Sequence, residues 1–241
     1  MKLPKRLMMG AKGPYKQRVA ALGPFKYFPM DEASGAAVVE AGGSGNGTYY
    51  NVGSGTLLQA DTLTDHPCPK FVPSSNGYAN LGFNTHFSAS FGLSLCLKVN
   101  IAACEVGDHI ISTNQYYAGA TNRFPFKIWY NKTTSKLESA LSKGTDFNTL
   151  DVIQLNIDDL TTYHIVINYV NSTYHEMYVN GVLHQQNALT WALPNSGYAW
   201  LVAHAHEYGG GVGKSGFAGS ISDVVFRAAP FTLAEIATLV P

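Results

Sequence analysis

Strict alternation between apolar and small or polar residues over positions 91–99 is the feature that most constrains the fold. A repeat of two residues places successive side chains on opposite faces of an extended chain, as in a β-strand. One face of this segment is wholly aliphatic and comprises Leu93, Leu95, Leu97 and Val99. The other face comprises Ser94, Cys96 and Lys98. We therefore predict a strand with its aliphatic face in a core and its second face less buried.

Hairpin signals lie further along the chain. Residues 163–169 form another apolar run, and residues 176–179 form its return strand. Asn180-Gly181 follows at once, and Asn-Gly between two apolar runs favours a two-residue hairpin turn in which both residues have positive φ. Residues 124–130 and 136–141 predict one more antiparallel pair. The chain therefore consists of short strands joined by tight turns.

A single helix signal is present, and it closes the chain. Thr232 and Glu235 have the spacing of a capping box, in which each side chain accepts a hydrogen bond from the backbone of the other residue. Ile236 and Leu239 follow at helical spacing. We predict one short helix after the last strand, in an all-β protein. Short strands at regular spacing favour a two-sheet sandwich or a barrel over a parallel α/β fold.

Charge divides the chain into two parts. The first 22 residues hold six basic side chains and no acidic one, whereas the other 219 residues hold ten basic and sixteen acidic side chains. We predict a basic N-terminal arm over residues 1–23 and one domain over residues 24–241. The arm either docks on an acidic partner surface or is a solvated terminus. Its basic residues are Lys2, Lys5, Arg6, Lys12, Lys16 and Arg18.

Composition excludes several classes of protein. Only 13% of residues are charged, against about 25% in an average soluble protein, which suits a chain that is packed into a larger assembly. Cys68, Cys96 and Cys104 are too few, and odd in number, for a disulfide framework. No apolar run matches a signal peptide or a membrane span. We expect no nucleic-acid partner and no membrane span.

Six short motifs, in order, resemble the laminin-G-like jelly rolls of the concanavalin-A-like class. The opening motif contains Asp31-Glu32-Ala33-Ser34-Gly35, and a Gly45-Asn46-Gly47 loop follows it. The other motifs lie at residues 87–98, 161–182, 217–224 and 233–236. The resemblance covers about residues 24–240. It implies an antiparallel two-sheet jelly-roll sandwich with one short C-terminal helix and an extended N-terminal arm. This fold hosts lectins, glycosidases and structural modules, so it does not fix the function.

Residues 15–24, which run directly into the first strand, are similar to the start of laminin-G-like proteins in tailed-bacteriophage structural modules. This resemblance implies a virion structural protein, a tail or capsid decoration component that forms a homo-oligomer in the particle. Its partners would be other virion proteins, contacted through the arm, and host-surface glycans, and it would be made in the host cytoplasm. The alternatives are a stand-alone bacterial carbohydrate-binding module and, less favoured, a glycosidase of the same fold.

Enzymatic activity is not expected. Catalytic members of this fold place paired carboxylates on one strand face, so that one acts as nucleophile or base and the other as acid. The close acidic pairs here are Asp31-Glu32 and Asp158-Asp159, and Glu105 and Asp108 stand apart. None of them is an i, i+2 pair on a predicted strand. No nucleophile-elbow motif supports a Ser-His-Asp hydrolase either.

Sugar binding requires aromatic faces with polar groups beside them. The candidates are aromatic or imidazole side chains in predicted loops: Tyr116, Tyr117, Trp191, His206 and Tyr208. The last two adjoin a glycine-rich loop at residues 209–216, and such loops are typical of adaptable binding surfaces. Trp129 and Trp200 lie within predicted strands, where we interpret them as packing residues.

Two groups of residues could hold a metal ion. His204 and His206 stand at i, i+2, which suits either a metal site or a pair of groove histidines. The family resemblance implies one structural Ca²⁺ held by oxygen ligands of the opening and closing loops. The matching residues are Asp31, Glu32 and Asp223. Ser222 stands where relatives usually carry Asp, and the alternative role for Asp31 and Asp223 is the capping of turns.

Overall fold

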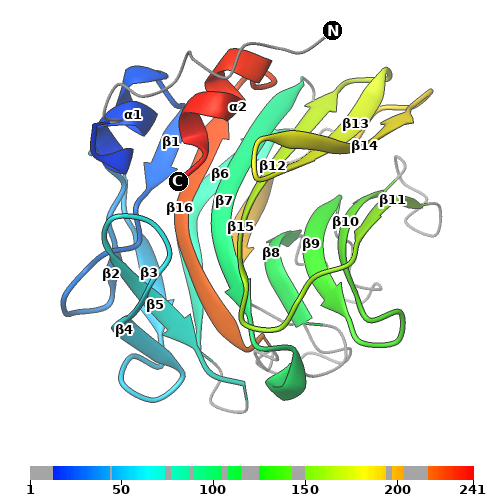
Figure 1. The fold of residues 1–241 in the computed structure, drawn as a ribbon. Helices are drawn as coiled ribbons and strands as arrows, with labels where there is room; N and C mark the ends of the chain where they lie inside the picture. The colour runs from blue at the N-terminus through cyan, green and yellow to red at the C-terminus, as the bar shows by residue number, and fades with distance from the viewer. Residues whose placement is uncertain are drawn as a thin grey trace, which may run out of the picture.

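The computed structural model describes nine stretches of the chain, namely residues 13–43, 45–73, 77–86, 90–104, 108–114, 125–142, 150–193, 197–203 and 217–241. They form two antiparallel sheets that pack face to face, with short helices at one side (Figure 1). The predicted all-β, two-sheet jelly-roll sandwich is confirmed. Among the described residues, no helix is long and apolar enough to cross a membrane.

Sheet A carries the strand predicted from the alternating segment at its centre. Its strand order is β14 (Val182–Ala188), β13 (Tyr174–Val179), β12 (Thr162–Val170), β7 (Phe91–Val99), β16 (Gly219–Arg227), β5 (Pro67–Phe71) and β4 (Thr56–Thr62). The short β1 (Lys26–Phe28) also pairs with β16. The first and last strands of the jelly roll are therefore neighbours.

Sheet B contains the other predicted antiparallel pair. Its strand order is β11 (Leu150–Leu155), β10 (Lys136–Ser142), β9 (Phe126–Asn131), β8 (Asp108–Asn114), β15 (Gly197–Val202), β6 (Tyr78–His86), β3 (Gly47–Tyr50) and β2 (Ala37–Val38). A short 3-10 helix, Ile101–Ala103, follows β7. The predicted pairing of β9 with β10 is confirmed, with Trp129 opposite Glu138.

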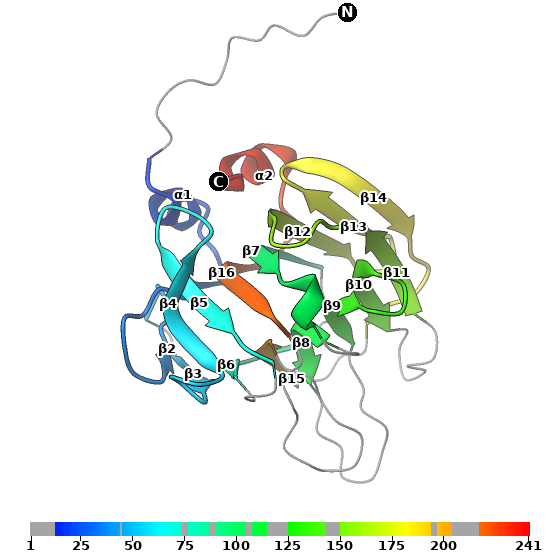
Figure 2. The ribbon, with the colours of Figure 1, turned by 60° about the horizontal axis from the view of Figure 1, so that its bottom comes forward.

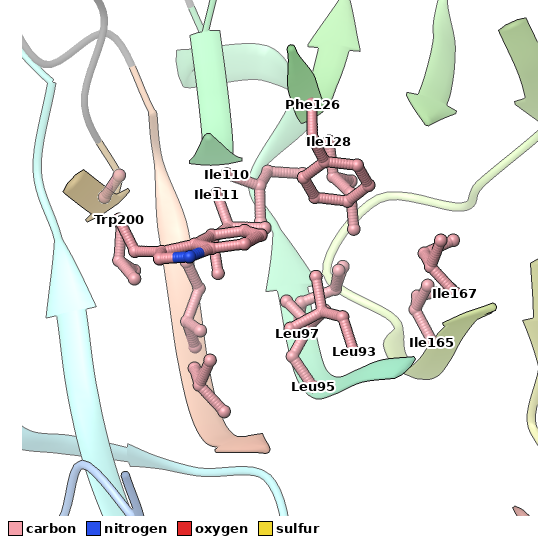
Figure 3. Close-up of a cluster of buried hydrophobic side chains, with 14 of the residues drawn as sticks. Leu93, Leu95, Leu97, Ile110, Ile111, Phe126, Ile128, Ile165, Ile167 and Trp200 are labelled. Carbon is pink, nitrogen blue, oxygen red and sulfur yellow. The ribbon is translucent and has the colours of Figure 1, made fainter. Parts of the chain in front are cut away.

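The main core lies between the sheets. The aliphatic face of β7 points into it and meets side chains of β12 and of sheet B (Figure 3). Trp200 is 1% exposed and contacts the rings of Phe126 and Phe226. Each large apolar side chain buried in this way contributes about 1.5–3 kcal/mol to stability. The prediction that Trp200 is a packing residue is confirmed.

A second core covers the outer face of sheet A. Helix α1 (Tyr15–Ala21) and helix α2 (Leu233–Leu239) lie next to each other on that side (Figure 2). Tyr15 and Val19 of α1 are buried there beside Cys96 of β7. The prediction that the Ser94, Cys96 and Lys98 face of β7 is less buried is wrong for the first two residues, which are fully buried, because the helices cover them.

The predicted turn and cap are confirmed. Asn180 and Gly181 join β13 to β14 with φ of 49° and 84°, the backbone that a two-residue turn of the primed type requires. Thr232 caps α2 through the backbone amide of Glu235, and Glu235 accepts in return from the amide of Thr232. The expectation of a single helix is wrong, however, because α1 is a second one.

Helix α1 joins the start of the described chain to its end. Tyr15 donates its backbone amide to Asp65 Oδ2 at 2.6 Å, and Lys16 forms an ion pair with Asp31. Arg18 donates to the carbonyl oxygens of Thr238 and Val240. Lys16 and Arg18, which we assigned to the arm, therefore belong to the folded unit. Lys2, Lys5, Arg6 and Lys12 lie outside the described residues.

Candidate functional site

The outer face of sheet B, turned away from sheet A, carries an unusual row of polar and aromatic side chains. Strand β9 alternates strictly, because Phe126, Ile128 and Tyr130 point into the core. Lys127 and Trp129 must then point outward. Cross-strand register places further side chains beside them. The partners of Lys127 are Ser112 and Ala140, and the partners of Trp129 are His109 and Glu138.

We define the Lys127–Trp129 site by six side chains of four adjacent strands. They are His109 and Ser112 of β8, Lys127 and Trp129 of β9, Glu138 of β10 and Gln154 of β11. In β9, β10 and β11 two-residue alternation places these side chains, whereas in β8 a register shift between His109 and Ile111 brings His109 and Ser112 onto the same face. Antiparallel partners on one face lie about 4.5–5.5 Å apart between Cβ atoms, so these six side chains form one continuous surface.

Lys127 and Trp129 form the centre of the site. The ammonium nitrogen lies 3.6 Å from the centroid of the indole ring, which is a close cation–π contact. The His109 ring approaches the same indole edge to face, with centroids 6.2 Å apart. Burial lowers the pKa of Lys127 to about 8, although the charge of Glu138 acts in the opposite direction. This lysine can therefore lose its proton close to neutral pH.

Glu138 is an acceptor held in place by three donors. Only 3% of its surface is exposed. Its Oε1 atom accepts from Gln154 Nε2 at 2.8 Å, from Thr134 Oγ1 at 3.0 Å and from Asn131 Nδ2 at 3.1 Å. A carboxylate with several neutral donors is oriented firmly and needs no cation beside it.

Three donors of the site lack acceptors. Ser112 Oγ and Trp129 Nε1 are buried and have no hydrogen-bond partner among the described residues. Within the same part of the chain Lys127 forms neither a hydrogen bond nor an ion pair, and the Trp129 ring is its charge partner. Buried polar groups are paired in more than nine cases out of ten. Unpaired groups gathered on one face are therefore a candidate ligand site.

The chemistry of the site suits carbohydrate recognition. A partly exposed indole offers an apolar face for the C–H groups of a sugar ring, while the half-buried Lys127 ammonium and Gln154 amide beside it can bind its hydroxyls. Trp129, which the sequence predicts to be a packing residue, is half-buried on the outer face and belongs to neither of the two buried clusters. The sequence signal for the outward position of Trp129 is the alternation Lys127-Ile128-Trp129. Because Ile128 points into the core, the indole points to the outer face.

The residues predicted for sugar binding are not assembled by the described structure. Tyr116, Tyr117, His206 and Tyr208 lie outside the described residues, as does His204 of the considered metal pair. Trp191 is half-buried and packs against the main core. It therefore contributes packing between the sheets, and its ring is not an open platform.

The predicted calcium ligands are occupied by other partners. Asp31 pairs with Lys16, and Glu32 accepts from the backbone amide of Val39 and from Tyr49 Oη at 2.6 and 2.8 Å. No group of three His, Cys, Asp or Glu side chains suited to a metal occurs in the described part of the chain. Asp31, Glu32 and Asp223 thus do not fit a shared Ca²⁺ in this structure.

Asp223 instead anchors a buried polar network beneath α1. It is fully buried and accepts from Tyr27 Oη at 2.6 Å, from Thr64 Oγ1 at 2.9 Å and from the His66 ring at 3.0 Å. Burial of the His66 ring opposes its charged form, but the hydrogen bond and charge of Asp223 outweigh burial and raise the pKa of His66. The network joins β5, β16 and the first strand, so its role is structural.

A second buried network has the connectivity of a hydrolase triad. His175 Nε2 lies 2.9 Å from Ser139 Oγ, and His175 Nδ1 lies 2.7 Å from Asp151 Oδ2. Asn187 donates to the other oxygen of Asp151. Ser139 and His175 are both fully buried, so the hydroxyl is sealed from substrate. The network links strands β10 and β11 of sheet B to β13 of sheet A.

The acidic pairs considered for catalysis are also engaged in the fold. Asp159 accepts from the backbone amide of Ile101 at 2.7 Å, and the backbone amide of Asp158 donates to Tyr163 Oη. Glu105 and the side chain of Asp108 lie outside the described structure. Asp158 and Asp159 therefore shape the turn before β12.

Comparison with known families gives one match. The model of the family described as the concanavalin A-like lectin/glucanases superfamily matches residues 73–237. That stretch runs from the loop before β6 into α2 and includes every residue of the Lys127–Trp129 site. No curated protein matches the chain.

Solved structures with the same fold include sugar-bound proteins. Trypanosoma rangeli sialidase in complex with sialic acid superposes with a TM-score of 0.62 at 13% identity, over 92% of this chain and 33% of the sialidase. The botulinum neurotoxin serotype D ligand binding domain in complex with N-acetylneuraminic acid gives 0.64 at 13% identity, over 91% and 51%. The binding domain of Paraclostridial Mosquitocidal Protein 1 gives 0.64 at 11% identity, over 89% and 51%. The chain thus spans about a third to a half of these proteins, and at such identities they show the fold alone.

Proposed function

The chain belongs to the concanavalin A-like lectin/glucanase superfamily, and on this premise we propose that it is a non-enzymatic lectin-like module that binds glycans through the outer face of sheet B. The observation that carries this proposal is the Lys127–Trp129 site. It combines an indole face, an oriented carboxylate and donors without acceptors on four adjacent strands. Carbohydrate is a ligand class that is bound by an aromatic face together with polar groups beside it.

Two observations support binding without catalysis. Glu138 is the acidic group of the site, and its neighbours on the described part of the same face are neutral or basic. Glycoside hydrolysis by the usual route requires two carboxyl groups about 5–10 Å apart across the bond that breaks. The Ser139–His175–Asp151 network, the other arrangement with catalytic connectivity, is sealed between the sheets.

Binding of the purified chain to a broad glycan panel tests the proposal, with calcium and with chelator present in parallel. Trp129→Ala is expected to weaken binding by about tenfold or more, because loss of a central aromatic contact costs about 2 kcal/mol. Phe25→Ala is the matched control, since Phe25 is 54% exposed and lies outside the site. Unchanged binding by Trp129→Ala would place the sugar elsewhere. Release by chelator would instead support a role for calcium.

We further propose that the chain is a structural component of a bacteriophage virion. This role is supported by the basic residues 1–12, which include Lys2, Lys5, Arg6 and Lys12, and by the resemblance of residues 15–24 to phage structural modules. Here the basic segment docks on other virion proteins and the sandwich, as a homo-oligomer, presents the glycan site. The alternative setting is a bacterial carbohydrate-binding module.

Incorporation into purified particles tests the virion role. We expect a variant with Lys2, Lys5, Arg6 and Lys12 changed to Gln to be absent from particles while its melting temperature is unchanged. Retention of this variant in particles would contradict docking through the basic segment.

A further inference from the structure

The Lys127–Trp129 site has an excess of donors over acceptors. Lys127 Nζ, Trp129 Nε1 and the Ser112 hydroxyl all lack an acceptor among the described residues. Ser112 and Lys127 are direct cross-strand partners, and Trp129 lies two residues from Lys127 on the same strand. The three donors therefore occupy adjacent positions of one face, on which the Ser112 hydroxyl and the indole N–H are buried and the half-buried Lys127 is the donor open to a ligand.

The one acidic group of the site does not supply the missing acceptor. The hydrogen bonds of Glu138 all reach Oε1 and come from neutral groups on Asn131, Thr134 and Gln154. Within the described residues Glu138 forms no ion pair with Lys127. The carboxylate of Glu138 is thus oriented toward β11 and the β9–β10 turn. The ammonium group of Lys127 contacts the Trp129 ring instead.

The net charge of this face also favours a negatively charged ligand. Lys136 lies on the outer face of β10 and donates to Gln154 Oε1 at 3.1 Å. Lys127 and Lys136 together exceed the single charge of Glu138, so the described part of this face is net positive. A half-buried ammonium without an acceptor is unfavourable, and an anion relieves this most, because charge-assisted hydrogen bonds are about twice as strong as neutral ones.

We infer that the ligand of this site is an acidic carbohydrate, whose carboxylate or sulfate group pairs with Lys127. The inference rests on the proposed glycan-binding function and adds the chemical class of the sugar. The Trp129 ring holds the ammonium in place. A neutral sugar would leave that ammonium without a counter-charge.

Matched pairs of ligands test the inference with the full chain. Calorimetric titrations would compare oligogalacturonate with its methyl ester, sialyllactose with lactose, and sulfated with unsulfated lactose. We expect the acidic member of at least one pair to bind about tenfold or more tightly, as one charge-assisted hydrogen bond predicts. The carboxylate and sulfate pairs distinguish the two sources of negative charge.

Variants of Lys127 assign the preference to its side chain. Lys127→Met retains most of the apolar stem and is expected to lose the preference for acidic sugars, whereas Lys127→Arg is expected to retain much of it. Lys70→Met removes an exposed lysine of β5 on sheet A and serves as the matched control. If Lys127→Met does not fold, the methyl ester comparison with the unaltered chain still decides the question.

The outcomes distinguish the acidic-sugar inference from the glycan-binding function on which it rests. Equal binding of both members of every pair would overturn the acidic-sugar inference and leave glycan binding intact. Binding of no member of any pair would count against the proposed function itself. A preference for acids that persists in Lys127→Met would overturn the role of this lysine.

Discussion

The ammonium nitrogen of Lys127 lies 3.6 Å from the centroid of the Trp129 ring, two residues away on the same strand. The contact exists because β9 places both side chains on the outer face while Ile128 between them enters the core. Burial without an acid partner lowers the pKa of Lys127 to about 8. The charge of the proposed glycan site therefore changes within an experimentally mild pH range.

Acidic-sugar binding is expected to weaken as pH rises above about 8. Below the pKa of Lys127 the site carries its ammonium, so affinity is constant. Above it the proton must be regained on binding, so affinity falls by up to about tenfold per pH unit. Calorimetric titration from pH 6 to 10, in wild type and Lys127→Met, measures this. The fall in affinity above about pH 8 should be absent in the variant. A fall that persists in Lys127→Met belongs to another group, and Glu138 and His109 are the other titratable side chains of the site.

The two strand tryptophans are expected to respond oppositely to truncation. Trp200→Ala opens a cavity in the main core, where the ring is 1% exposed, and should lower the free energy of unfolding by about 3–5 kcal/mol. Trp129→Ala removes a half-buried ring from the outer face and should cost much less stability while weakening glycan binding. Denaturant melts and the glycan panel measure the two effects. A large stability loss in Trp129→Ala would make it a packing residue after all.

Much of the fold could be predicted because the residues concerned act locally. The alternation over 91–99 gives β7, Asn180-Gly181 gives the turn between β13 and β14, and Thr232 with Glu235 gives the start of α2. Helix α1 was missed because its capping residue is Pro14, with no side-chain cap. Tertiary contacts hold it, since Tyr15 and Val19 are buried only against sheet A and α2.

The candidate site was harder to predict because it depends on cross-strand register. The spacing of Lys127 and Trp129 predicts that both lie on one face of a strand. Their place in a site also depends on Ser112 and Glu138, which become their neighbours only because β9 pairs with β8 and β10. No sequence pattern around Glu138 predicts the three hydrogen bonds that its carboxylate accepts. The aromatic residues predicted for sugar binding were instead those in predicted loops, and of these Trp191 packs against the main core.

The His66–Asp223 pair is expected to make stability depend on pH. The pKa of His66 is raised in the folded chain, so its charged form is favoured by folding. The resulting stabilisation is complete below the unfolded pKa of about 6.5. It is lost as pH rises through the raised folded value. Denaturant melts from pH 5 to 9 should show this decline, and His66→Gln should lack it. An identical decline in the variant would assign the effect to other groups.

Removal of the carboxylate is expected to be more damaging. Asp223→Ala leaves Tyr27, Thr64 and His66 without their buried acceptor. Breaking one side of a buried charged pair costs about 3–5 kcal/mol. Thermal melts at pH 6 measure the loss. Asp61→Ala is a suitable comparison, because Asp61 pairs with Lys98 in a more exposed position and should cost far less.

Gly181→Ala is expected to strain the turn between β13 and β14. The glycine has φ of 84°, and an added Cβ would lie 2.6 Å from Val240 Cγ2. Left-handed backbone costs a residue with Cβ about 1–2 kcal/mol, and Val240 must move in addition. Thermal melts of this variant and of Gly35→Ala, which has positive φ but open space around it, separate the two contributions. Equal losses would show that the contact with Val240 is unimportant.

Two truncations are expected to separate the basic segment from the folded unit. Removal of residues 1–12 leaves α1 intact, so the melting temperature should be unchanged. Removal of residues 1–22 takes away Tyr15 and Val19, which are 1% and 0% exposed, and uncovers Cys96 beneath them. Loss of two large buried side chains costs about 4 kcal/mol or more. This corresponds to a fall of roughly 8–16 °C in a chain of this size. If both truncations melt like the full chain, α1 contributes nothing to stability. If the shorter truncation is stable yet fails to enter particles, docking belongs to residues 1–12 alone.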